Sequence, residues 1–264
     1  MRRPDPIHPS DTPSETRALA ARGGARRMKA ILVLAAVAAF ITAPWFAAGF
    51  GGFDPDLFPV RQDRPPVQPA GYAFGIWGLI YAWLVLHAGF GLLMRAEDDG
   101  WDAGRWPLIV SLVVGAGWIA AANASPPLAT GMIWVMLAGA LAALALTRPD
   151  GAAMADRWLG PAPLAVYAGW LTAAAWVAVG FMLGGYDVLA PVWAAALAVP
   201  LAVAMAVAVQ LGLGRCPEYG LTVIWALVAV ILANWGSAWG LVLLGALGVA
   251  AMAATVARVV RSAS

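Results

Sequence analysis

Few residues in this chain of 264 carry side chains that could act as acids, bases, nucleophiles or metal ligands. Histidine occurs only as His8 and His87, and cysteine only as Cys216. A zinc or iron–sulfur site needs several such ligands. The sequence shows no Ser/His/Asp set, no paired carboxylates within an apolar run and no glycine-rich phosphate loop in a strand–helix context. We therefore expect no metal, no cofactor and no enzymatic activity.

His87 is the one ionisable residue placed deep inside an apolar segment. Proton- and ion-coupled transporters usually keep such a group at membrane depth, so His87 is a candidate for proton transfer. The simpler interpretation, which we favour, is a neutral histidine bonded to a backbone or tyrosine oxygen.

Aromatic rings are the other side chains here that could bind a ligand. In the stretch 69–81, a proline opens the segment and Phe74, Trp77 and Tyr81 recur at i, i+3 and i+7. On a helix these three residues share one face. A second face is smooth enough for close packing of another helix; it consists of Gly71, Gly75 and Gly78.

Three further tryptophans lie deep in apolar segments, namely Trp118, Trp134 and Trp170. Together with Trp77 they could form walls for a flat apolar ligand such as a tetrapyrrole, with indole N–H groups orienting its polar edge. Ordinary packing between helices explains them equally well. Six others fall near segment ends, where tryptophan gathers at membrane interfaces: Trp45, Trp106, Trp158, Trp193, Trp235 and Trp239.

The elements that position these residues are membrane-spanning helices. The chain is 62% hydrophobic and 11% charged, its mean hydropathy is +0.79, and soluble domains are about 25% charged. At about 20 apolar residues per span, we predict an all-α integral membrane protein. Its eight spans are 30–50, 70–94, 106–124, 127–147, 161–184, 188–212, 218–235 and 237–259.

The basic residues predict the orientation. If the N-terminus lies inside, 14 of the 16 Lys and Arg residues fall on the inner side, and only Arg61 and Arg64 lie outside. The positive-inside rule then places both termini in the cytoplasm. For the same reason, we interpret the pI near 9.0 as a sign of topology and expect no nucleic-acid partner.

Two segments outside the spans have distinct compositions. Residues 1–28 are rich in Pro, Ser, Arg and Ala without apolar periodicity, which predicts a disordered cytoplasmic tail; a cleaved signal peptide is the alternative. The loop 51–69, with five prolines and several charges, is the long outer connection. It could act as a lid or serve as a solvated linker.

The order of these features resembles the TspO/translocator-protein family, the tryptophan-rich sensory proteins. The second span has Pro69, then Trp77 eight residues on, then Tyr81. The third has a tryptophan at 118, and the fifth has the Tyr-x-x-Trp of Tyr167 and Trp170. The resemblance covers about residues 30–185.

The resemblance implies a five-helix bundle over 29–185 that includes the outer loop 51–69, followed by three additional spans in 186–264. It also implies a multi-pass protein of the cell (inner) membrane, with a small hydrophobic ligand near Phe74, Trp77, Tyr81, Trp118, Trp134, Tyr167 and Trp170. The family's polar Asn late in the fifth helix is Ala178 here, so we expect a less polar cavity.

Three functions stay open at this point. The first is a membrane-embedded sensory or regulatory protein that binds a small hydrophobic, tetrapyrrole-like ligand. The second is a carrier for such a molecule, and the third is a structural membrane protein without a ligand. Membrane lipid is an expected partner in each case, and the glycine face also suggests a homodimer.

Overall fold

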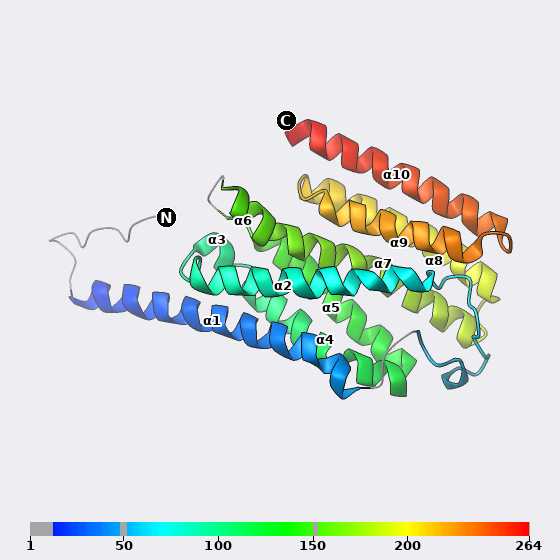
Figure 1. The fold of residues 1–264 in the computed structure, drawn as a ribbon, viewed down its shortest axis with the longest axis horizontal. Helices are drawn as coiled ribbons and strands as arrows, with labels where there is room; N and C mark the ends of the chain where they lie inside the picture. The colour runs from blue at the N-terminus through cyan, green and yellow to red at the C-terminus, as the bar shows by residue number, and fades with distance from the viewer. Residues whose placement is uncertain (1–12, 48–51, 150–152, 264) are drawn as a thin grey trace.

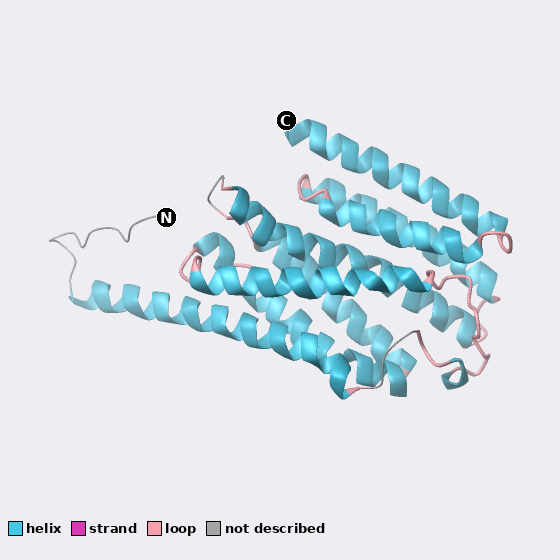
Figure 2. Ribbon diagram, in the orientation of Figure 1, coloured by secondary structure: helices cyan, strands magenta, loops and turns pink. Residues whose placement is uncertain are grey.

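The computed structural model describes residues 13–47, 52–149 and 153–263, and within these ranges every regular element is a helix (Figure 2). The long helices are α1 (Pro13–Phe46), α2 (Ile76–Leu93), α4 (Arg105–Ala124), α5 (Pro126–Leu146), α7 (Pro161–Gly185), α8 (Pro191–Leu213), α9 (Glu218–Asn234) and α10 (Trp239–Ala263). Short helices are α3 (Asp99–Asp102) and α6 (Met154–Leu159), with 3₁₀ turns η1 (Pro55–Leu57) and η2 (Gly71–Gly75).

The predicted all-helical membrane fold is confirmed. Among the described residues, seven helical segments are long and apolar enough to cross a membrane, and α9 is a shorter apolar helix of 17 residues. Together they make eight helices, near the predicted spans. The turn between α4 and α5 is as tight as expected, because the Ser125 hydroxyl accepts from the Leu128 N–H and Pro126 starts the next helix.

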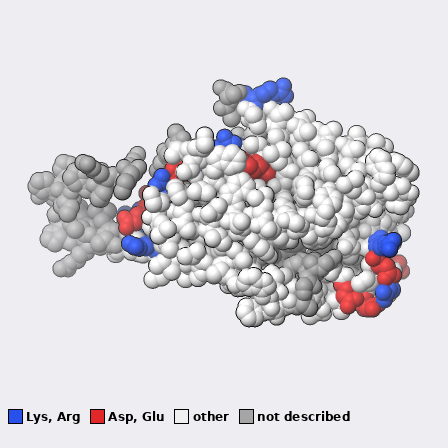
Figure 3. Space-filling view, viewed as in Figure 1, with Lys and Arg blue, Asp and Glu red and all other residues white. Residues whose placement is uncertain are grey.

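The long helices alternate in direction, so α1 begins and α10 ends at the same end of the bundle (Figure 1). On the face drawn in Figure 3, charged side chains gather at the left and at the lower right, a few more lie in the upper middle, and the broad area between them is uncharged. Arg95, Arg105 and Arg215 lie in connections or helix starts at the end shared by the termini, whereas Arg61 and Arg64 lie in the opposite loop. The positive-inside rule predicts that the shared end faces the cytoplasm.

Helix α7 is the centre of the bundle. It packs against α2 and α5 on one side and against α8 and α9 on the other, and most of its residues are buried. Helix α10 packs on α8 and α9. The division of the chain at residue 185 into a five-helix bundle and an addition stays a prediction, since α7 contacts both groups.

The N-terminal segment differs from its prediction. Residues 13–28, predicted as part of a disordered tail, belong to helix α1; the rest of that tail, 1–12, lies outside the described residues. Ion pairs join Arg26 to Asp99 and Lys29 to Asp102. Alanine and arginine are good helix formers, and the two ion pairs hold α1 against α3. A search for apolar periodicity detects neither of these causes of helix formation.

The glycine face predicted to suit close helix packing is open in this structure. Gly71, Gly75 and Gly78 are exposed, and a Cβ built on any of them meets no atom within 4 Å. No described helix of this chain packs there, because the opposite face of the segment points into the bundle with Ala73 and Ile80. A homodimer through these glycines stays a prediction.

Candidate ligand-binding cavity

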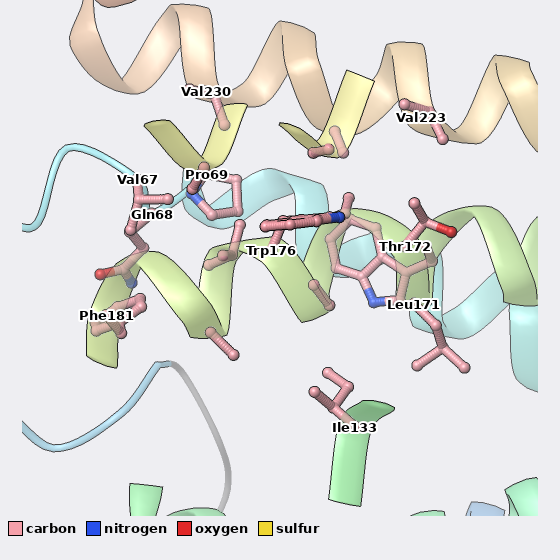
Figure 4. A pocket seen from close by; sticks show the side chains of 18 of the residues that line it. Val67, Gln68, Pro69, Ile133, Leu171, Thr172, Trp176, Phe181, Val223 and Val230 are labelled. Atoms are coloured by element: carbon pink, nitrogen blue, oxygen red, sulfur yellow. The ribbon is translucent and has the colours of Figure 1, made fainter. Parts of the chain in front are cut away.

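A largely apolar cavity lies between α7, α8 and α9, beneath the loop that precedes α2 (Figure 4). Its volume, measured as the space open to the centre of a water molecule, is about 100 Å³. In Figure 4, Val223 and Val230 of α9 lie on one side and Ile133 of α5 on the other. The cavity is therefore shared between the first five long helices and the last three.

Three aromatic rings from three elements form one wall. Phe74 comes from η2, Trp77 from α2 and Trp170 from α7. The Trp170 ring meets the other two edge to face, with centroids 5.9 Å from Phe74 and 6.2 Å from Trp77. Edge-to-face pairs stabilise by about 0.5–1.5 kcal/mol beyond area burial, so each ring is fixed by its neighbours.

The outer loop covers the cavity. Phe53, Val67, Gln68 and Pro69 line it from the loop side, and Val67 is only 2% exposed. Val67 lies so close to α7 that a Cβ on Gly180 would be 2.7 Å from its Cγ2 atom. The loop is thus a packed cover in this structure, as the lid interpretation of 51–69 requires; position 51 lies outside the described residues.

Helix α9 holds this cover in place through polar contacts. The Asn234 side-chain amide donates to the Pro66 carbonyl at 2.8 Å, and the Ala70 N–H donates to the Ala229 carbonyl at 3.0 Å. The Trp225 indole N–H donates to the Ala73 carbonyl at 3.2 Å. Such bonds are strong in a water-poor setting, so α9 both lines the cavity and fastens the loop.

Four of the seven sequence-predicted ligand residues line the cavity: Phe74, Trp77, Trp118 and Trp170. The other three are not among its lining residues. Tyr81 contacts Trp77 and Phe40, and Trp134 contacts Trp176. Tyr167 is fully buried and its hydroxyl lies 3.0 Å from the Ser111 hydroxyl. These three positions support the walls from outside.

Sequence reasoning missed many of the other residues that line the cavity. Trp176 and Phe181 line the cavity from α7, and small or aliphatic residues line it from α8 and α9. Residues 170, 174, 177 and 181 recur at helical spacing, a signal that could have identified Phe181. The contributions of α8 and α9 carry no such signal, because alanine and valine are equally common on faces that contact lipid.

The six tryptophans assigned to membrane interfaces are all exposed at helix ends.

His87 is buried at the basic end of the bundle. Its Nδ1–H donates to the Leu159 carbonyl at 2.8 Å, and its ring stacks on Trp101. The neutral, backbone-bonded interpretation of His87 fits this geometry.

A polar network surrounds that histidine. Both carboxylate oxygens of Asp156 accept from the Arg95 guanidinium at 2.8 Å, and the Trp101 indole N–H donates to the same carboxylate. These contacts join the segment that follows α2 to α3 and α6 at the basic end. Cys216 lies in the connection between α8 and α9. Burial raises the pKa of its thiol, so the thiol is a weak nucleophile. Among the described residues, no cluster of His, Cys, Asp or Glu could hold a metal ion.

Comparison with known proteins agrees with the fold. A family model described as TSPO-like protein matches residues 30–260. The match continues through α8, α9 and α10, beyond residue 185 where the predicted resemblance ended. No curated protein and no solved structure matches the chain.

Proposed function

Because the chain belongs to the TSPO-like family, we propose that this multi-pass membrane protein binds a small apolar ligand in the cavity between α7, α8 and α9. Its role is sensory or regulatory: the bound ligand changes how the outer loop and α9 are held. The protein lies in the cell (inner) membrane, and the end of the bundle that carries most of the Lys and Arg residues faces the cytoplasm.

The observation that carries the proposal is the aromatic wall of Phe74, Trp77 and Trp170 beneath an ordered loop. Ligand sites are typically concave, mostly apolar and provided with a few polar groups that orient the ligand. A tightly packed bundle with no ligand has no need for open space at its aromatic centre, since protein interiors are otherwise close-packed.

Ligand binding is tested with purified protein in nanodiscs. Quenching of tryptophan fluorescence is measured with porphyrins, haem, sterols and indoles, and compared with empty nanodiscs. Ala226, which is 5% exposed and lines the cavity, is replaced by Phe to fill the space. The matched control is Ala251→Phe on an exposed face of α10.

We expect saturable binding that Ala226→Phe abolishes and Ala251→Phe preserves. If both variants bind the ligand equally well, the binding site lies elsewhere in the protein. If no compound shows saturable binding, the proposed function is wrong. Uptake assays in liposomes separate the two roles of a binding protein. Binding without flux supports the sensory role, whereas gradient-driven uptake would identify a carrier.

A further inference from the structure

A second hollow lies on the outside of the bundle, between the basic ends of α9 and α10. By the same measure as the cavity, its volume is about 550 Å³, and most of its lining residues are exposed. We call it the α9–α10 groove; it is lined by Leu221, Ile224, Ala253, Val256, Ala257, Val260 and Arg261. None of these residues lines the cavity, so two different faces of α9 border the two spaces.

Small side chains on α10 make room for the groove. Ala253 and Ala257 lie one helical turn apart on the same face, and both are exposed. Beside them the two helices are in close contact, because a Cβ added to Gly220 would lie 2.5 Å from the Cγ2 atom of Val256. This contact closes the groove towards the interior of the bundle, so its open side faces the surrounding membrane.

The length of the groove matches one leaflet of a bilayer. From Ala253 to Arg261 the helix rises about 12 Å, at about 1.5 Å per residue. Half of a hydrocarbon core of about 30 Å is about 15 Å. The groove begins at the end of the bundle that the positive-inside rule places in the cytoplasm. An extended acyl chain of the cytoplasmic leaflet therefore fits along it.

The cytoplasmic end of the groove is basic. Arg261 lines it, and the Arg261 Nε–H donates to the carbonyl of Ala257, another lining residue, at 3.1 Å. Arg258 precedes Arg261 by three positions and shares its face of the helix. Helix α10 contains no Asp or Glu, and in Figure 3 the basic side chains at its end have no acidic side chain next to them. The one acidic residue of α9, Glu218, is buried and ion-paired with Arg157.

We propose that the α9–α10 groove binds an anionic phospholipid of the cytoplasmic leaflet. One acyl chain lies along Ala253 and Ala257, and the headgroup phosphate accepts hydrogen bonds from the guanidinium groups of Arg258 and Arg261. Guanidinium groups match phosphate oxygens in geometry and charge. A zwitterionic headgroup would bring its own ammonium group towards these arginines, so an anionic one is preferred. The inference goes beyond the proposed function, since it assigns a separate site to a different ligand.

A second copy of the chain suits this groove less well. Most homodimers have twofold symmetry, with the same surface patch on both subunits. In a membrane the axis of such a dimer runs along the bilayer normal, so the ends of both α10 helices lie at the same depth. Arg258 and Arg261 of the two copies would then meet in one interface, where like charges repel.

The charge of the site is tested by native mass spectrometry of the full chain, titrated in detergent with phosphatidylglycerol or with phosphatidylcholine of the same acyl chains. The double variant Arg258→Gln, Arg261→Gln removes the proposed phosphate ligands. The matched control is Arg22→Gln, Arg27→Gln, which removes two exposed arginines of α1 at the same end of the bundle. Both double variants lose the same net charge.

The decisive quantity is the ratio of phosphatidylglycerol affinity to phosphatidylcholine affinity within one variant, because loss of folded protein affects both lipids alike. We expect one saturable site that prefers phosphatidylglycerol. The ratio should fall about 25-fold in Arg258→Gln, Arg261→Gln, which is about 1 kcal/mol per arginine, and should keep its wild-type value in the control. An equal fall in both double variants would show only general attraction to a basic surface and would overturn the inference.

The acyl-chain part of the groove is tested by filling it. Ala253→Phe should abolish the saturable site, whereas Ala254→Phe should preserve it, because Ala254 is also exposed but does not line the groove. The same spectra report the other occupants. A dimer that Ala253→Phe dissociates would assign the groove to a second copy. Tighter binding of cholesterol than of phosphatidylglycerol, lost in Ala253→Phe, would make it a sterol site. Either result contradicts the proposal.

Discussion

Gly180 is the position where one added methyl group should open the cavity's cover. A Cβ there would lie 2.7 Å from the Cγ2 atom and 3.1 Å from the Cβ atom of Val67, closer than packed carbons approach. The loop must therefore shift in Gly180→Ala. Overpacking of this kind costs about 1–3 kcal/mol. If the whole of this cost destabilises the closed loop relative to the open one, the population of the open state rises roughly five- to 150-fold, at about 1.4 kcal/mol per decade.

Trypsin cleavage after Arg61 reports that opening. Arg61 is in the loop, and the next residue, Gln62, is only 4% exposed with its amide bonded to the Val60 carbonyl. A protease needs several residues in extended form, so cleavage follows the open population when opening is fast. We expect faster cleavage of Gly180→Ala in nanodiscs, with protection restored by a bound ligand.

The matched control is Gly131→Ala in α5, where an added Cβ meets no atom within 4 Å. It makes the same change in helix propensity and should leave the cleavage rate at the wild-type value. Equal rates for the two variants would refute the view that Val67 packs on α7 as a cover.

Three further predictions concern topology, the aromatic wall and the basic end. Cysteines placed at Ser262 and Asp63, with the native cysteine replaced, should label from opposite sides of the membrane; labelling from one side would refute the helix count. Trp77→Ala should weaken a bound ring ligand about tenfold, measured by fluorescence titration, and Trp239→Ala at the exposed end of α10 should change affinity little. Asp156→Ala leaves a partly buried arginine unpaired and should lower thermal stability in detergent far more than Asp63→Ala in the exposed loop; equal melting temperatures would contradict it.

The fold was largely predictable from the sequence because span length is a strong physical constraint. Apolar runs of about 20 residues, separated by signals such as Ser125 followed by Pro126, indicate helices in a membrane regardless of their partners. The start of α1 was not predictable in this way. Its ordering depends on Arg26 and Lys29 pairing with acidic residues some 70 positions away, and periodicity carries no information about such contacts.

The candidate site was only half predictable. Ring spacing correctly suggested that Phe74 and Trp77 share a face, and both line the cavity with Trp170. Tyr81 follows the same spacing but lies beyond the cavity, against Phe40. The wall from α8 and α9 consists of residues such as Ala198 and Val223, which look the same in sequence whether they contact ligand or lipid.

The most direct test of the account is to find where a bound ligand lies. A diazirine derivative of the compound that binds most tightly in the fluorescence assay is photolysed on the protein in nanodiscs, and the labelled residues are identified by mass spectrometry. The account predicts labelling at residues that line the cavity, such as Val67, Trp170 and Val223, and an excess of the unlabelled compound suppresses this labelling. Labelling confined to exposed helix ends such as Trp193 and Trp239, unaffected by competitor, would contradict it.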